Sequence, residues 1–224
     1  MTAAERFPHR LTIVTGHYGT GKTEFSVNLA LALAGGGERT ALADLDIVDP
    51  YFRSRERRDL LEAAGVRLIA SPQSCADADV PALPAELLSV LEDRTVRGVL
   101  DVGGDPSGAR VLARWRARLL REDCQVLCLV NASRPEVRSA EGTVEYLRGI
   151  EAVTGLPCTG LVNNTHLCGE TTAEVVRAGA DLAEEVSRRT GIPVVCHAAE
   201  ERLADQLADL PLFPIEIRMK RPWE

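Results

Sequence analysis

The chain has 224 residues, of which 45% are hydrophobic and 26% are charged, the proportions of an ordinary soluble globular protein. A chain of this length can bury roughly 70% or more of its unfolded surface, so a single domain over residues 1–224 is stable without disulfides. The net charge of −7 argues against a general nucleic-acid-binding surface, which is usually basic.

The apolar residues and the cysteines point to a cytoplasmic protein. No apolar stretch approaches the roughly 20 residues needed to span a bilayer, and no signal peptide is recognisable at the N-terminus. The six cysteines contain no Cys-x-x-Cys pair, and Cys124 and Cys128, on one apolar run, are too far apart to share a metal easily. We therefore expect reduced thiols rather than a zinc or iron–sulfur site.

Runs of strand length alternate with helix-length segments along the chain. Strands are expected at residues 10–16, 39–46, 66–70, 97–105, 125–130, 159–163 and 193–197. Helices are expected at residues 23–37, 55–64, 85–93, 108–122, 135–153 and 171–190, with a short helix near 200–209. Residues 71–84 contain three prolines and are expected to form a loop, and about the last 12 residues a tail.

This alternation predicts a three-layer α/β/α domain with a mainly parallel sheet. The strand segments are continuous apolar runs, as expected for strands that helices cover on both faces. Ligands of such sheets bind beside the carboxyl ends of the strands. Residues that directly follow a strand are therefore the first candidates for a functional site.

The first expected strand leads into a segment that matches a phosphate-binding loop, Gly16-His17-Tyr18-Gly19-Thr20-Gly21-Lys22-Thr23. Glycines let successive N–H groups turn around phosphate oxygens, and the following helix adds its positive N-terminal end. Lys22 is expected to reach the β- and γ-phosphates, and Thr23 to ligate Mg²⁺. Glu24, the next residue, is counted with this nucleotide-binding segment. A plain glycine-rich turn is the alternative, which the strand–loop–helix context disfavours.

Two later strands end in carboxylates, which a phosphate loop needs to hold Mg²⁺ and to position water. Asp44 and Asp46 end the second strand, and we expect one near the Mg²⁺ shell and the other beside the attacking water. Asp101 ends the strand near residue 100 and is expected to hold Mg²⁺ through water. Gly104 lies three residues further on, where an amide can contact the γ-phosphate and sense its loss. A simple turn is the alternative at each of these strand ends.

The segments GHYGTGKT, DLDIVDP and DVGG together resemble the MinD/ParA group of P-loop ATPases, which includes the nitrogenase iron protein and metal-insertion ATPases. The resemblance covers residues 12 to about 108 well and the rest loosely. It implies the P-loop NTPase fold, Mg-ATP as ligand, slow hydrolysis to ADP, and a nucleotide-dependent switch that serves a protein partner or a homodimer. By its place in the DLD motif, Asp46 would position the hydrolytic water, with Asp44 nearer the Mg²⁺.

The resemblance also implies where adenine would bind. In this family an asparagine after the strand CTGLVNNTH hydrogen-bonds the base, which makes Asn164 the first candidate and Asn163 the second. A turn is the alternative, since asparagine tolerates left-handed backbone. The loop after the next strand would pack on the base through His197 or Ala198. No Asn-Lys-x-Asp segment is present to bind guanine, so ATP is expected over GTP.

His17 departs from the pattern of this family. Many members carry a signature lysine at this position, which reaches the phosphates of a partner subunit across an ATP-sandwiched dimer. Histidine is shorter and mostly neutral at pH 7, so that in-trans role does not transfer to His17 directly. A loop residue outside the phosphate shell is an equal alternative for His17. Tyr18 replaces the first of the paired glycines.

Two other functions fit the same scaffold. Dethiobiotin synthetase and the cobyrinate amidation enzymes share this fold and phosphorylate a carboxylate, and the arginines at 53–58 would then hold an acidic substrate. A metallochaperone-like binding module with negligible turnover is the second, although the lack of a Cys-x-x-Cys pair weakens its metal-cluster form. Otherwise the arginines at 53–58 and 110–121 form solvated faces.

Overall fold

A computed structural model describes residues 1–46, 54–70 and 85–219. Its centre is one eight-stranded sheet of order β3-β2-β4-β1-β5-β6-β7-β8, in which every neighbouring pair of strands is parallel. The strands are β1 (Leu11–Gly16), β2 (Thr40–Asp44), β3 (Arg67–Ala70), β4 (Arg97–Asp101), β5 (Cys124–Val130), β6 (Gly160–Asn163), β7 (Val194–Glu200) and β8 (Leu212–Ile215). The parallel sheet expected from the sequence is thereby confirmed.

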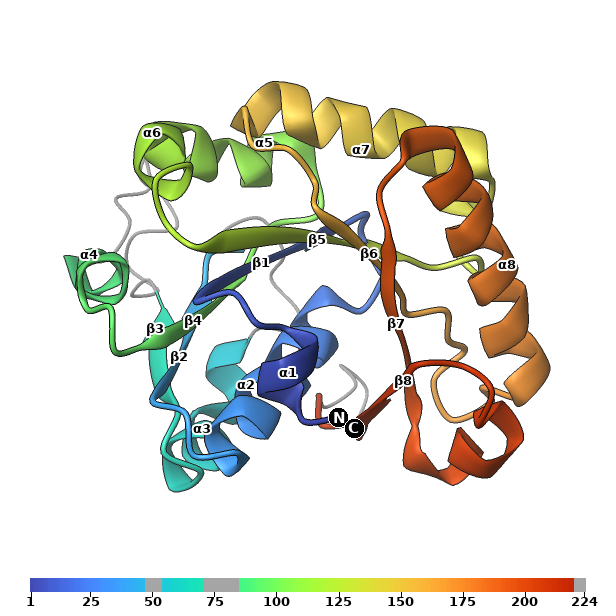
Figure 1. The fold of residues 1–224 in the computed structure, drawn as a ribbon, viewed down its shortest axis with the longest axis horizontal. Coiled ribbons are helices and arrows are strands. Elements are labelled where there is room, and N and C mark those ends of the chain that lie inside the picture. Colours follow the sequence, from blue (N-terminus) through green and yellow to red (C-terminus); the bar gives the residue numbers. More distant parts are fainter. Residues whose placement is uncertain (47–53, 71–84, 220–224) are drawn as a thin grey trace.

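Helices cover both faces of the sheet and form the outer two of three layers (Figure 1). One face carries α1 (Ala3–Arg6), α2 (Lys22–Gly35) and α3 (Arg58–Ala63), the last preceded by the 3-10 turn η1 (Ser54–Arg57). The other face carries α4 (Ala85–Glu92), α5 (Pro106–Ala109), α6 (Arg116–Leu119), α7 (Ala140–Thr154) and α8 (Ala173–Thr190). The α/β/α architecture is therefore the one that the alternating strands and helices predict.

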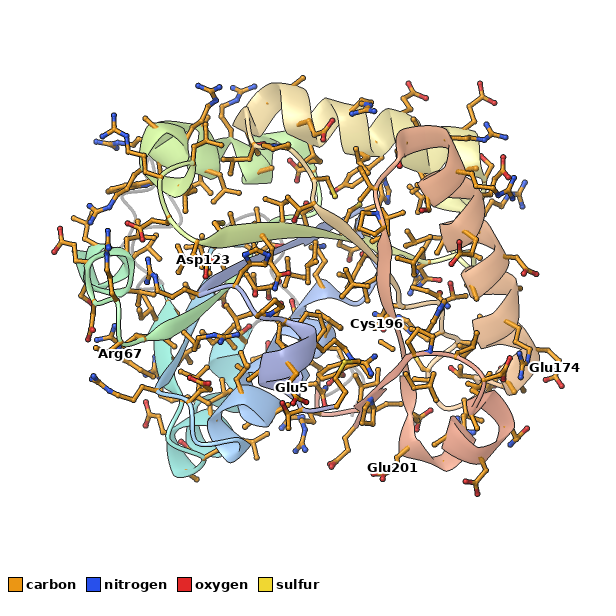
Figure 2. The ribbon with its side chains drawn as sticks, viewed as in Figure 1. Glu5, Arg67, Asp123, Glu174, Cys196 and Glu201 are labelled. Atoms are coloured by element: carbon orange, nitrogen blue, oxygen red, sulfur yellow. The ribbon has the colours of Figure 1, made fainter. Side chains whose placement is uncertain are left out.

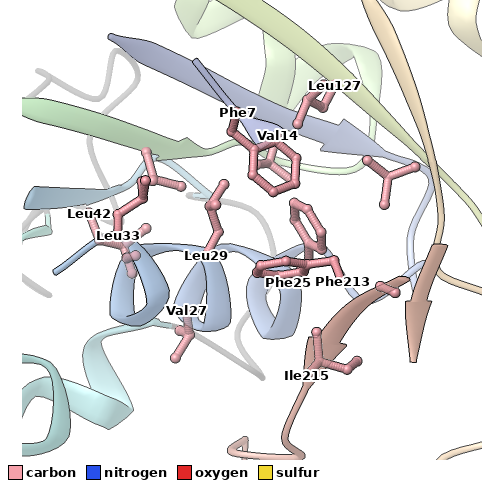
Figure 3. Close-up of a cluster of buried hydrophobic side chains, with 14 of the residues drawn as sticks. Phe7, Val14, Phe25, Val27, Leu29, Leu33, Leu42, Leu127, Phe213 and Ile215 are labelled. Carbon is pink, nitrogen blue, oxygen red and sulfur yellow. The ribbon is translucent and has the colours of Figure 1, made fainter. Parts of the chain in front are cut away.

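The side chains of β1 alternate between two buried cores, because successive residues of a strand point to opposite faces. Ile13 packs in a core beneath α4, and Val14 packs in the core beneath α2. Three phenylalanines anchor the α2 core, with ring centroids 5.3 to 5.9 Å apart in edge-to-face pairs (Figure 3). They are Phe7 before β1, Phe25 on α2 and Phe213 on β8, so the two ends of the chain share one core.

This shared core corrects the expectation of a C-terminal tail that begins near residue 213. Residues 212–215 form β8, which pairs with β7, and Phe213 is buried. The segment reads as a tail because it is short and is interrupted by Pro214. Packing of Phe213 on Phe7 and Phe25 supplies the apolar contact that the local pattern does not reveal.

Two expected helices are interrupted. Residues 108–122 form the end of α5, the 3-10 helix η3 (Arg110–Trp115) and α6 instead of one helix. Residues 135–153 begin as the 3-10 turn η4 (Pro135–Val137). The α7 helix starts afresh at Ala140, where the Ser139 hydroxyl caps it by accepting from Gly142 N at 3.1 Å. The short helix expected near 200–209 is the 3-10 helix η5 (Glu201–Leu207).

Candidate nucleotide site

The loop between β1 and α2 is built around three glycines with positive φ angles. These are Gly16 at 154°, Gly19 at 74° and Gly21 at 84°. The Thr20 backbone N–H and hydroxyl both donate to His17 O, at 3.1 and 2.8 Å, and so close the loop on itself. This closed turn needs backbone angles that glycine adopts without strain.

The loop and the start of α2 present a row of open backbone donors. Gly21, the N-cap residue, provides no side-chain cap to this 14-residue helix. Within the described residues, no hydrogen-bond acceptor faces the backbone N–H groups of Tyr18, Gly19, Gly21, Lys22 or Thr23. Unsatisfied donors at a helix N-terminus, together with the helix dipole, favour an anion.

Lys22 and Gly104 close this cradle from the side of β4. Lys22 is only 7% exposed, and a Cβ built on Gly104 would lie 2.7 Å from Lys22 Nζ. The same Cβ would lie 2.9 Å from Tyr18 N and 3.1 Å from Gly16 O. The segment after β4 therefore lies directly on the phosphate loop, which brings two sequence-predicted residues together.

The carboxylates predicted for Mg²⁺ and water gather at the same edge of the sheet. Asp44 and Asp101 are register partners on neighbouring strands, and Val14 of β1 pairs with Asp101 on its other side. Asp44, Asp46 and Asp101 are all buried. A Cβ on Gly103 would lie 3.3 Å from Asp46 Oδ1, so Asp46 faces the segment that leads to Gly104.

The Asp101 carboxyl group is buried close to the carboxylate of Asp44. Burial, followed by the negative charge of Asp44, raises the pKa of Asp101 to about 7, against the opposing effects of Lys22 and the Thr23 hydroxyl. The Ser54 hydroxyl donates to Asp101 Oδ2 at 3.3 Å, whereas Oδ1 is buried without a hydrogen-bond partner among the described residues. A cation would relieve this arrangement.

Thr23 and Asp101 fit Mg²⁺ as part of a nucleotide complex. Among the described residues, no group of three or more His, Cys, Asp or Glu side chains is arranged to hold a metal ion by itself. Mg²⁺ at nucleotide sites takes few protein ligands and completes its shell with phosphate oxygens and water. The Thr23 hydroxyl interacts with the Asp101 carboxylate, and Asp101 Oδ1 has no hydrogen-bond partner among the described residues, so these two side chains offer the oxygen ligands that such a complex requires.

A cavity of about 350 Å³ opens beside the phosphate loop. This volume lies in the range of small-molecule sites. Its walls come from the loop between β1 and α2, the start of α2, the loops after β5 and β6, the end of β7, and the end of β8 with the segment that follows it: Tyr18, Gly19, Gly21, Lys22, Thr23, Glu24, Arg134, Asn164, Thr165, His166, Cys168, Thr171, Ala198, Ala199, Glu200, Ile215, Ile217 and Met219.

Asn164 joins this cavity to the phosphate loop. It is 1% exposed, and its Nδ2 donates to Thr20 O at 2.7 Å. Because a carbonyl oxygen can only accept, this contact fixes which end of the amide is Nδ2. Asn164 Oδ1 is buried and has no hydrogen-bond partner among the described residues.

Asn163 and His197, also predicted at the base, lie behind the cavity wall. Asn163 Nδ2 donates to Val176 O at 2.9 Å and lies 3.2 Å from His197 Nδ1. Its Oδ1 accepts from Thr165 N at 3.1 Å. Neither residue lines the cavity, whereas Asn164 and Ala198 do. Asn163 and His197 therefore connect the neighbouring strands β6 and β7. A contact of either residue with a base stays a prediction.

His17 lies to one side of the cavity. Its ring packs edge-on against Tyr146 with the centroids 5.4 Å apart, and its Nδ1 lies 3.3 Å from Tyr18 O. His17 is not part of the cavity lining, whereas Tyr18 is and remains 58% exposed. The segment with Asp49, Arg53 and the Arg55 side chain lies outside the described residues.

Glu24 supports the cavity wall instead of facing the phosphate cradle. Its carboxylate accepts from Arg218 N at 2.8 Å and Met219 N at 3.1 Å, and burial raises its pKa. One turn later, Asn28 exchanges hydrogen bonds of 2.9 Å with the backbone of Glu216. The C-terminal segment is thereby tied to α2, a role that the sequence did not reveal.

The cysteines contribute little to the site. The five described cysteines are free. Burial raises the pKa of Cys158 and of Cys196, which lies on β7 in the interior (Figure 2), to about 12. Cys168 alone lines the cavity, with a φ of 52° and its Sγ 3.9 Å from His166 Nδ1. Cys75 lies outside the described residues.

In the parts of the chain that the structure describes, no helix is long and apolar enough to cross a membrane. No protein-family model and no curated protein sequence matches the chain.

Structural comparison finds solved proteins with a similar fold. The cell division protein FtsY from Thermotoga maritima matches 92% of this chain and 65% of its own, with 19% identity and a TM-score of 0.58. Chloroplast FtsY from Physcomitrella patens matches 84% of this chain and 57% of its own, with 18% identity and a TM-score of 0.58. The signal recognition particle 54 kDa protein from Aeropyrum pernix, solved with GDP, matches 84% and 40%, with 24% identity and a TM-score of 0.54.

The chain spans between 40% and 65% of the length of these three proteins. At such identities the likeness concerns the fold. Together with the parallel sheet and the loop between β1 and α2, it shows that the chain has the α/β fold of P-loop NTPases.

Proposed function

We propose that this protein is a Mg-ATP-binding P-loop ATPase of the MinD/ParA type, a slow hydrolase whose shape or association changes with the bound nucleotide. The observation that carries the proposal is the meeting of Lys22, Asp101 and Gly104 around the open amides at the start of α2. Lys22 follows β1, whereas Asp101 ends β4 and Gly104 follows it, and each provides what a bound triphosphate requires.

The residues divide the chemistry among themselves. The loop amides and Lys22 hold the phosphates, and Thr23 and Asp101, with Asp44 close by, hold Mg²⁺. The Mg²⁺ neutralises phosphate charge when bound. Asp46 orients a water whose oxygen bonds to the γ-phosphorus as the bond to the β–γ bridging oxygen breaks. The bond electrons leave with ADP, and phosphate and a proton are released.

The backbone of Gly104 couples hydrolysis to the conformation of the segment after β4. It lies against both Lys22 Nζ and the loop amide of Tyr18, where the γ-phosphate of a bound triphosphate would sit. Loss of that phosphate removes a ligand from the segment after β4, which lies next to Asp46. A segment that is ordered by the γ-phosphate and released on hydrolysis is a recurring form of nucleotide switch.

We favour adenine as the base, and Asn164 supports this choice. The free acceptor Oδ1 of Asn164 complements the 6-amino group of adenine, whereas guanine presents a carbonyl oxygen there. We expect ATP to bind at least about tenfold more tightly than GTP, a difference of roughly 1.4 kcal/mol. Isothermal titration with Mg-ATP, Mg-GTP and Mg-ITP measures it.

GTP is the second candidate, because the Glu200 carboxylate also lines the cavity and two similar structures were solved with GDP. Glu200 is ion-paired with Arg202 at 2.6 Å, which draws its Oε1 away from a base. Guanine would replace adenine in this proposal if the wild type binds GTP tightly but binds ITP, which lacks the 2-amino group, more weakly. In that case Glu200→Gln should also weaken GTP binding.

The switch is tested with Asp46→Ala, which should bind Mg-ATP and retain it unhydrolysed. Size-exclusion chromatography and limited proteolysis of this variant with Mg-ATP, with Mg-ADP and without nucleotide compare its states. We expect Mg-ATP alone to shift the elution toward a dimer or to protect the chain from cleavage. Asp59→Ala, at an exposed position of α3, is the matched control. Identical behaviour with ATP and ADP would remove the switch from the proposal.

A further inference from the structure

Arg134 is placed beside the phosphate loop by the pairing of β5 with β1. The two strands are in register from Leu11 and Cys124 to Gly16 and Leu129, so the loops that follow them are neighbours. Arg134 ends a tight turn in which its N–H donates to Asn131 O at 3.2 Å. Its backbone is extended, with φ −103° and ψ 122°, as the following proline favours.

The side chain of Arg134 lies directly on Gly19. Its Nε donates to Gly19 O at 2.6 Å. A Cβ built on Gly19 would lie 2.9 Å from this Nε and 3.0 Å from the central guanidinium carbon. The guanidinium therefore approaches the loop backbone as closely as the absence of a side chain at position 19 permits.

The two terminal nitrogens of the Arg134 guanidinium, Nη1 and Nη2, make no hydrogen bond among the described residues. Within the described residues, neither Nη1 nor Nη2 of Arg134 has a hydrogen-bond acceptor, and no carboxylate lies within ion-pair distance. Arg134 is half-buried and lines the cavity. A planar guanidinium with two open donors suits phosphate oxygens, which it binds bidentately.

Among the described residues, Lys22 and Arg134 are the two Lys or Arg side chains in the cavity lining. Neighbouring His166 is not a third cation, since burial, followed by the charge of Arg134, lowers its pKa to about 4. His17 is turned toward Tyr146 and lies outside the lining. Arg134 therefore provides a second positive charge for a triphosphate, and it does so from the loop after β5 and not from position 17.

We propose that Arg134 acts in cis as the second cation of the phosphate site, with its Nη groups on the phosphates while Nε stays on Gly19 O. The inference rests on the proposed function and adds a residue to it. A bound triphosphate would then be neutralised within one subunit. Charge that develops on the β–γ bridging oxygen during hydrolysis would be stabilised without a lysine from a partner.

The test compares Arg134→Gln with Arg134→Lys, because both side chains can donate to Gly19 O but only lysine keeps the charge. Hydrolysis of saturating Mg-ATP is followed in single turnovers, and the dissociation constants of ATP and ADP are measured for each variant. Arg138→Gln, at an exposed position four residues away, is the control.

We expect Arg134→Gln to slow hydrolysis by about 100-fold or more and to reduce the preference for ATP over ADP by about tenfold. Arg134→Lys should stay within about tenfold of the wild-type rate, and Arg138→Gln should be unchanged. If hydrolysis cannot be detected in the wild type, the ratio of the ATP and ADP dissociation constants decides alone.

Equal behaviour of the Gln and Lys variants would show that Arg134 only braces the loop, and would overturn the inference. Equal weakening of ATP and ADP with an unchanged rate would place Arg134 at the base and overturn it as well. Failure of the wild-type protein to bind any nucleotide is a separate result, which removes the proposed function and this inference with it.

Discussion

The ammonium of Lys22 occupies the space into which a side chain at position 104 would extend: a methyl group on Gly104 would lie 2.7 Å from Lys22 Nζ. The same methyl group would lie 2.9 Å from the amide nitrogen of Tyr18. A separation under 3.0 Å forces one of the two groups to move. The close approach of β4 to the phosphate loop therefore depends on the absence of a side chain at position 104.

Gly104→Ala should weaken Mg-ATP binding by at least about tenfold, because the new methyl group displaces Lys22 or pushes the segment after β4 away from the γ-phosphate. ADP binding should change less, since ADP lacks that phosphate. Isothermal titration with the two nucleotides measures both effects. ATP affinity within about twofold of the wild type would show that Gly104 plays no part in γ-phosphate recognition.

Gly149→Ala is the matched control for this substitution. Gly149 lies within α7, and a Cβ added there meets no atom within 4 Å. Alanine in a helix interior is about 0.5–1 kcal/mol more favourable than glycine, so this variant should melt at a higher temperature. Its nucleotide affinity should be that of the wild type.

Glu24→Ala should loosen the C-terminal wall of the cavity. The substitution leaves the backbone amides of Arg218 and Met219 without their acceptor, at a cost of about 1–3 kcal/mol for each that stays buried. We expect a lower melting temperature, faster hydrogen exchange at residues 216–219 and weaker binding of both ATP and ADP. Glu62→Ala, which removes an exposed i,i+4 pair with Arg58, should change stability by less than about 0.5 kcal/mol. Equal effects of the two substitutions would contradict the role given to Glu24.

His166 should make the protein sensitive to acid. Its folded-state pKa of about 4 lies below the ordinary value of 6.5, because burial first and then Arg134 oppose the charged form, while Glu200 favours it. A lowered pKa adds stability that is fully present above pH 6.5 and is lost as the pH falls toward 4. Between pH 7 and 4.5, wild-type protein should lose on the order of 2 kcal/mol more than His166→Gln. Urea unfolding at both pH values measures this loss. An equal loss of unfolding free energy in the two proteins would contradict the role given to His166.

The phosphate loop, Asp44, Asp101 and Gly104 could be predicted because each is fixed by local pattern together with one topological rule. The spacing of the glycines predicts the phosphate loop, and parallel strands bring their carboxyl ends to one edge of the sheet. The same rule points to Asn164, which follows β6 and contacts Thr20, whereas its contact with a base stays a prediction. The order of neighbouring strands was not needed for any of these.

Arg134 and the C-terminal wall could not be found in this way, because both depend on which strands are neighbours. Arg134 reaches Gly19 only because β5 lies beside β1. The residues after β8 reach Glu24 only because Phe213 packs on Phe7 and Phe25. These contacts join positions more than 100 residues apart, and no local period records them.

The central claim is that the loop around Lys22 holds a nucleoside triphosphate, and equilibrium binding of Mg-ATP to the wild-type and Lys22→Ala proteins tests it most directly. Lys22 is buried beside Gly104, where its ammonium has no substitute within the loop. We predict saturable one-to-one binding by the wild type and at least about 100-fold weaker binding by Lys22→Ala, with circular dichroism spectra that superimpose. Equal affinities in two folded proteins, or no binding to the wild type, would contradict the account.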